Sequence, residues 1–130
     1  MPRLSTVPEP SPEKPYKIRE RLFVFACDVA RVAQKLLTRP GIGAALSSQL
    51  VGAAVSAAAN AEEADDASSR RDFLAKERIV LRELKETRLR LRVLKESGLL
   101  ESQDKPLIDE STQLVKIVAT ILRNSTQGRA

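Results

Sequence analysis

The chain has 130 residues, a net charge of +5, one cysteine and no histidine. A single cysteine excludes an intrachain disulfide, and without histidine the common zinc sites and the Ser/His and Cys/His catalytic arrangements lack their parts. Aromatic residues make up only 3% of the sequence, so aliphatic and small side chains must form the core, which favours packed helices over a β-sandwich.

The first sixteen residues hold five prolines. Proline at this density blocks helix formation and sheet pairing, so we predict a flexible tail over residues 1–16. This tail lacks the apolar core of a signal peptide, and no apolar run comes close to the ~20 residues that span a bilayer. We therefore expect a cytoplasmic protein without membrane contact.

Two helices are predicted in the first half of the chain, over about residues 18–38 and 43–66. The first is ended by Arg39-Pro40-Gly41, because proline disfavours the helical conformation before it and glycine tolerates positive φ. Ten alanines between Ala44 and Ala67 make the second helix thin, so that neighbouring backbones can approach closely. Apolar residues recur every three or four positions in both: Leu22, Phe25, Val29, Val32 and Leu36, then Leu46, Leu50, Ala53, Ala57, Ala61 and Ala64.

Two further helices are predicted over about residues 70–97 and 104–122. Ser69 and Asp72 suit the start of the third helix and Gly98 its end, while Pro106 suits the first turn of the fourth. We predict one bundle domain over residues 17–123 and a frayed tail over 124–130. Because the links are short, the expected fold is all-α, an up-down-up-down antiparallel four-helix bundle. The predicted core faces comprise Leu74, Leu81, Leu84, Leu91 and Leu94, then Leu107, Ile108, Leu114, Val115, Val118, Ile121 and Leu122.

Polar residues recur at helical spacing inside the alanine-rich second helix. Because buried polar groups must be paired, we interpret them as part of a structural network that fixes helix register or a subunit contact. A ligand pocket inside the bundle is the alternative interpretation. The predicted network consists of Gln49, Ser56, Asn60, Glu63, Glu83 and Glu86.

The carboxylates Glu63, Glu83 and Glu86 also raise the question of a di-metal site. Di-iron bundles need Glu-x-x-His motifs on two helices, which a chain without histidine cannot supply. Paired carboxylates for glycoside hydrolysis need a substrate cleft, for which a narrow alanine-lined bundle is a poor place. We predict no metal, no cofactor and no enzymatic activity.

The third helix is strongly basic. From Arg70 to Lys95 it holds ten basic and four acidic residues, a local balance of +6. Such a stripe can bind phosphate groups, or it can be a solvated face or pair with the acidic end of the second helix of a neighbouring subunit. No aromatic residue interleaves with it, so base stacking is not expected. The stripe comprises Arg78, Arg82, Lys85, Arg88, Arg92 and Lys95.

The order of residues resembles the four-helix bundle family encoded in intervening sequences of bacterial 23S ribosomal RNA genes. The resemblance covers about residues 21–123, and implies a left-handed antiparallel bundle that assembles as a ring, typically a homopentamer. A basic residue is usual where Gly52 stands, and an aromatic pair where Leu89-Arg90 stand. The matching residues are Arg21, Phe23, Phe25, Ala26, Ser56, Asn60, Glu63, Ala64, Asp72, Phe73, Lys76, Glu83, Glu86, Thr87 and Arg88.

Accessory proteins of diversity-generating retroelements resemble the same fold, and bind a reverse transcriptase and nucleic acid through a basic surface. We do not extend that specific role to this chain. The leading interpretation is a non-enzymatic, oligomeric scaffold or adaptor that binds RNA or a ribonucleoprotein through the basic stripe. The alternative is a protein-interaction module without nucleic-acid contact.

Overall fold

A computed structural model describes residues 15–126, and the secondary structure of this part of the chain is entirely helical. The four helices are α1 (Pro15–Leu36), α2 (Ile42–Asp65), α3 (Arg70–Glu96) and α4 (Pro106–Thr126), and a short 3-10 helix, η1 (Ser102–Asp104), precedes the last of them. The prediction of an all-α fold from four helices is therefore correct, and all four starting points lie within about three residues of those predicted.

The predicted boundaries need two corrections. The tail was expected to include residues 15 and 16, but α1 already begins at Pro15, because proline lacks the N–H that the first turn would leave unpaired. At the other end α4 continues to Thr126, beyond the predicted limit at residue 123, since Leu122 and Ser125 are both buried against the bundle. The rest of the two predicted tails, residues 1–14 and 127–130, lies outside the described residues.

The turns are built as the sequence predicts. Gly41 has a φ of 73° and stands directly before α2. At the start of α3, the Ser69 side chain accepts a hydrogen bond from the Asp72 backbone N–H at 3.0 Å. At its end Gly98 has a φ of 74°, and the following Leu99 N–H reaches back to the Leu94 carbonyl at 2.8 Å. This pattern is a Schellman cap, which satisfies carbonyls that the helix end leaves free.

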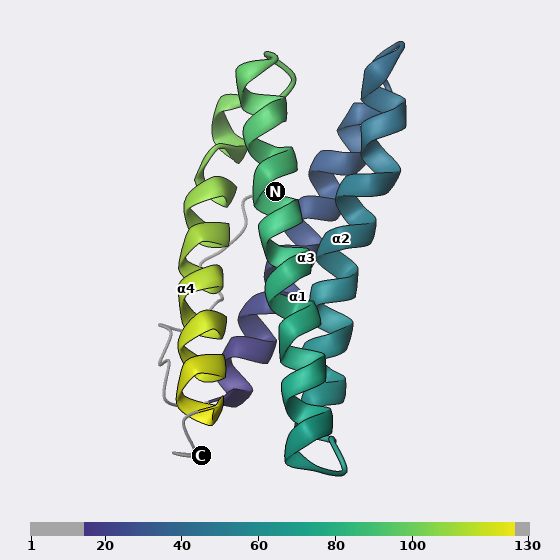
Figure 1. Cartoon of the computed structure of the whole chain (residues 1–130). Coiled ribbons are helices and arrows are strands. Elements are labelled where there is room, and N and C mark those ends of the chain that lie inside the picture. The colour runs from purple at the N-terminus through teal and green to yellow at the C-terminus, as the bar shows by residue number, and fades with distance from the viewer. Residues whose placement is uncertain (1–14, 127–130) are drawn as a thin grey trace.

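Each helix packs against the helices next to it in the chain, and α4 also contacts α1. Figure 1 shows the α2–α3 turn at the opposite end of the bundle from the α1–α2 turn and the α3–α4 connection. The contact between α1 and α4 is the least extensive of the four, and it closes the bundle.

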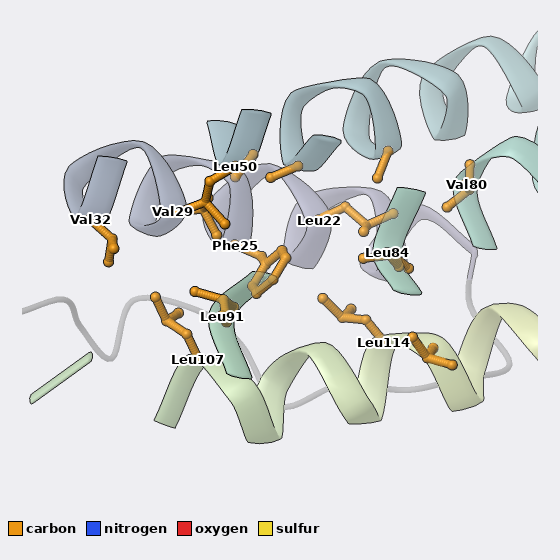
Figure 2. Packing of buried hydrophobic residues seen from close by; sticks show 14 of the residues in the cluster. Leu22, Phe25, Val29, Val32, Leu50, Val80, Leu84, Leu91, Leu107 and Leu114 are labelled. Atoms are coloured by element: carbon orange, nitrogen blue, oxygen red, sulfur yellow. The ribbon is translucent and has the colours of Figure 1, made fainter. Parts of the chain in front are cut away.

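The core lies along the axis between the four helices (Figure 2). All five predicted α1 positions, Leu22 to Leu36, are buried, and Phe25 is the largest of them. From the other helices Leu50, Leu84, Leu91 and Leu114 are fully buried. Val80 and Thr87 of α3 are also fully buried, although the predicted α3 face did not include them.

The second helix is more apolar than we expected. It is 24 residues long with a mean hydropathy of 1.5 over its most apolar window, so by length and composition alone it could cross a membrane. The expectation that no segment is long and apolar enough was therefore wrong, because alanine and glycine add to a run that no charge interrupts from Pro40 to Ala61. A core helix of a bundle passes the same test, and α2 packs against α1 and α3. Only 33% of that window is buried, which leaves an apolar outer face.

Candidate functional site

The six basic residues of the predicted stripe lie along α3, and five of them are exposed while Arg88 is half-buried. Within residues 15–126, Arg82 is the only one of the six with an ion pair, in which its Nη2 lies 3.4 Å from Glu83 Oε2. The other cationic groups can therefore meet an external anion without breaking an internal pair. The exposed residues are Arg78, Arg82, Lys85, Arg92 and Lys95.

Most acidic residues of α3 lie away from the stripe. Lys76 marks the side of α3 that faces α2, since its Nζ lies 2.8 Å from Glu63 Oε1. Glu83 is two helical turns farther along and therefore lies on that same side. Glu86 is held by Arg90 at 3.2 Å, while Glu83, which contacts Arg82, and Glu96, at the end of the helix, are near the stripe. This separation of charge leaves one side of α3 positive.

A shallow hollow of about 440 Å³ lies at the end of this basic side, between α3 and α4. Two exposed apolar residues stand in it, Leu89 and Val93, with 57% and 44% of their surface exposed. The sequence analysis did not predict that these two residues would form an exposed apolar surface. Both lie off the core face of α3, within a run of charged residues. The hollow is lined by Leu89, Arg92, Val93, Lys95, Glu96, Ser97 and Ile108.

Five of the six residues of the predicted polar network form short, separate contacts within residues 15–126. Asn60 donates from Nδ2 to the Ser56 carbonyl at 2.9 Å and lies 3.3 Å from its Oγ, one turn back on the same helix. Gln49 is exposed, and Glu63 joins α2 to α3 through Lys76. Glu83 and Glu86 pair with arginines of their own helix. A subunit contact involving these residues stays a prediction.

Ion pairs that sequence reasoning missed join α1 to the end of the chain. The Arg21 guanidinium, largely buried, makes two hydrogen bonds to Glu110 of α4. Lys35 Nζ donates to Glu101 at 2.9 Å and to Asp104 at 2.7 Å. Its hydrogen bond to Asp104, then that to Glu101, raises the pKa of Lys35, and Lys35 in turn lowers the pKa of Glu101. Asp104 lies in η1, so this contact joins the last turn of α1 to the connection between α3 and α4.

A cavity of about 180 Å³ lies between the four helices at the end of the bundle where α2 turns into α3. Glu77 of α3 lines it with only 6% of its surface exposed, and within the described residues it has no hydrogen bond or ion pair. Burial, and secondarily the charge of Asp65, raises the pKa of Glu77 to about 7. The lining residues are Ile18, Arg19, Leu22, Ala61, Ala64, Asp65, Phe73, Glu77, Val118 and Ile121.

Arg19 and Asp65 form an ion pair at this cavity. Arg19 Nε lies 2.7 Å from Asp65 Oδ2, but its N–H does not point at the oxygen, so the buried nitrogen has a charge contact without a hydrogen bond. Across residues 15–126, no group of three or more His, Cys, Asp or Glu side chains is placed to hold a metal ion. In this part of the chain the interior carboxylates are thus not clustered: each is either isolated or paired with a cation.

Comparison with known proteins identifies the family. A family model described as 23S rRNA-intervening sequence protein matches residues 14–120, and the chain therefore belongs to this family. It is similar to a crystal structure of a protein with unknown function from the S23 ribosomal protein family of Bacteroides thetaiotaomicron. The two share 25% sequence identity with a TM-score of 0.76, and the match covers 84% of this chain and 97% of that chain. No curated protein matches this chain.

Proposed function

We propose that this member of the 23S rRNA-intervening sequence protein family is a non-enzymatic, self-assembling scaffold that binds RNA or a ribonucleoprotein through the basic side of α3. The observation that carries the proposal is the separation of charge across α3. Five exposed cationic side chains follow one side of the helix, and the carboxylates beside them within residues 15–126 are Glu83, paired with Arg82, and Glu96 at the helix end. Phosphate binding needs this arrangement, because interleaved carboxylates would cancel the attraction.

Exposed residues of α4 add to the positive charge. Lys116 and Arg123 of α4, and Lys105 directly before it, are all exposed, and no ion pair within residues 15–126 engages them. Leu89 and Val93 supply apolar contact area amid the charges, which favours a ribose or a protein surface over stacked bases. Binding of this kind depends little on nucleotide sequence and strongly on salt.

We propose that subunits contact one another through exposed apolar residues of α1, of α2 and of the turn between them. Phe23 of α1, Leu37 in the turn after α1, and Ile42 and Val55 of α2 have 54%, 61%, 64% and 49% of their surface exposed. The chain carries no charge from Pro40 to Ala61, so no charge in this part of α2 opposes burial against another copy. Exposed hydroxyl and amide groups of α2, such as Gln49, suit a protein contact better than lipid.

The assembly we propose is a ring of up-down-up-down antiparallel bundles, with five subunits as the first choice. Short connections at alternating ends of the bundle support this topology. In a ring the basic side of α3 recurs in every subunit, so several weak phosphate contacts act together on one long RNA. Such a protein would act in the cytoplasm without membrane contact.

The alternative is an interaction module in which the basic stripe meets the acidic end of α2 in a neighbouring subunit. The ion pairs within the chain argue against it. Asp65 is already held by Arg19 at 2.7 Å and Glu63 by Lys76 at 2.8 Å, which leaves only Glu62 and Asp66 exposed and free for such a contact.

One pair of measurements on the same sample tests the proposal. Light scattering after size exclusion gives the subunit number, and filter binding gives the retention of a long, unstructured RNA at about 50 mM salt, where electrostatic binding is strong. We expect a discrete oligomer that retains RNA and releases it as salt rises. An oligomer without RNA retention would support the interaction module instead.

A further inference from the structure

The cavity at the α2–α3 end of the bundle contains a carboxyl group without a partner. Glu77 lines it, is more than nine-tenths buried, and makes no hydrogen bond or ion pair within the described residues. Leaving a buried carboxyl unpaired costs free energy, and native structures normally pair such groups or give them a function. The lack of a partner for the Glu77 carboxyl group therefore needs an explanation.

The charges around Glu77 are unbalanced. From α1 comes the Arg19 guanidinium, from α2 the Asp65 carboxylate, and α4 contributes only the apolar Val118 and Ile121. Arg19 Nε is paired with Asp65 at 2.7 Å, and within residues 15–126 no cation forms an ion pair with Glu77. When Glu77 is ionised the cavity carries one negative charge in excess, and burial together with Asp65 accordingly raises the pKa of Glu77 to about 7.

We propose that this cavity binds a small primary alkylammonium ion, with the ammonium group on Glu77 and the alkyl chain against Leu22, Phe73 and Ile121. The volume of about 180 Å³ corresponds to about six water molecules at ~30 Å³ each, which suits a chain of about four to six heavy atoms. An ammonium group supplies the hydrogen-bond donors and the charge that Glu77 lacks. The apolar walls exclude water from the alkyl chain.

The same chemistry could come from a free amine or from a lysine side chain. The probe for the first is n-butylamine, and the probe for the second is Nα-acetyl-lysine methylamide, whose side chain has the same alkylammonium end. Butan-1-ol has nearly the same shape as n-butylamine without its charge. Binding of each is measured by calorimetry and by NMR chemical-shift changes with the full chain at pH 8, where Glu77 is ionised and the amine is charged.

Three variants accompany the wild type. Glu77→Gln keeps the shape of the side chain and removes its charge, and Glu96→Gln is the matched control at an exposed glutamate of the same helix. Ala64→Met adds side-chain volume to the lining of the cavity and keeps the Glu77 carboxyl group. Circular dichroism melting curves verify that each variant is folded.

We expect n-butylamine to bind the wild type and Glu96→Gln alike, and to bind Glu77→Gln at least about tenfold more weakly, as expected when a charge-assisted hydrogen bond is lost. Ala64→Met should not bind it. Affinity should fall at pH 6, where Glu77 takes up a proton. If acetyl-lysine methylamide binds as well, a lysine side chain is the natural source; if it does not, the source is a free amine.

Two results would overturn the proposal. The first is no binding of either amine to the wild type, which would mean that water or the chain itself fills the cavity. The second is equal binding of n-butylamine and butan-1-ol, or undiminished binding to folded Glu77→Gln, which would make the cavity merely apolar.

Discussion

Arg21 of α1 holds Glu110 of α4 in a two-point contact, with Nε donating to Oε2 at 2.9 Å and Nη2 to Oε1 at 2.7 Å. The Arg21 side chain is 9% exposed, so removal of its partner leaves a buried charge without compensation. We predict that Glu110→Ala lowers the free energy of unfolding by on the order of 3 kcal/mol, measured by urea denaturation. The more exposed pair Arg90–Glu86 is the control, and Glu86→Ala should cost less than about 1 kcal/mol. Equal costs for the two variants would contradict this prediction.

The raised pKa of Glu77 predicts that stability falls as pH rises. The folded state holds the proton up to about pH 7, whereas the unfolded state releases it near 4.5. The folded state therefore has its full advantage below pH 4.5 and loses it as pH rises through 7, by on the order of 3 kcal/mol. Urea denaturation of wild type and Glu77→Gln from pH 4 to 8 measures the difference. Glu77→Gln should not lose stability as pH rises, whereas Glu96→Gln should lose it as the wild type does. Parallel plots of unfolding free energy against pH for all three proteins would contradict the prediction.

Two exposed valines provide a matched test of the assembly surface. Val55 of α2 and Val93 of α3 are 49% and 44% exposed, so a glutamate is sterically tolerated at both. We predict that Val55→Glu shifts the wild-type oligomer to smaller species in light scattering, because it places a charge within the uncharged stretch of α2. Val93→Glu should leave the subunit number unchanged. A monomeric wild type at micromolar concentration, or the reverse response of the two variants, would refute the proposed surface.

The basic side of α3 is tested by charge reversal. Arg82, Lys85 and Arg92 are exposed, so their replacement by glutamate should leave helicity intact. We predict that the triple variant loses RNA retention at about 50 mM salt, where electrostatic attraction dominates.

The control for this experiment is the triple glutamate variant of Arg39, Arg70 and Arg71, which changes the net charge equally at the turns flanking α2. It should retain most of the binding. If both triple variants bind RNA as the wild type does, or if the wild type itself does not bind, the stripe is a solvated face.

The spacing of apolar residues and the capping residues predicted the helices well, because helix formation depends on residues that are close in sequence. The spacing of Leu22 to Leu36 identified the buried face of α1, and Ser69 and Gly98 identified both ends of α3. Pro15 was misassigned to the tail because the density of prolines before it outweighed its suitability for a first helical turn.

The interior contacts of the candidate site could not be predicted in the same way. Arg21 and Glu110 are 89 residues apart, and no periodicity identifies which acid a basic residue will meet across a bundle. Glu77 resembled any other charged residue of a basic helix, and it is buried only because α1, α2 and α4 all close over it. The stripe on α3 was predictable because its members share one helix. The hollow beside it was not, because it combines Leu89 and Val93 of α3 with Ile108 of α4.

The contact between α1 and α4 also orders the folding of the chain. Contacts of α1 with α2, of α2 with α3 and of α3 with α4 join segments that follow one another, and can form as each pair becomes available. Arg21 and Lys35, in contrast, find their partners 89 and at least 66 residues later. Closing such long loops carries the larger entropic cost. The Lys35 ion pairs need the segment that follows α3, and the Arg21–Glu110 pair completes the bundle only after its part of α4 has been synthesised. Until then the Arg21 guanidinium of α1 lacks its native partner. The native bundle is therefore complete only when α4 is present.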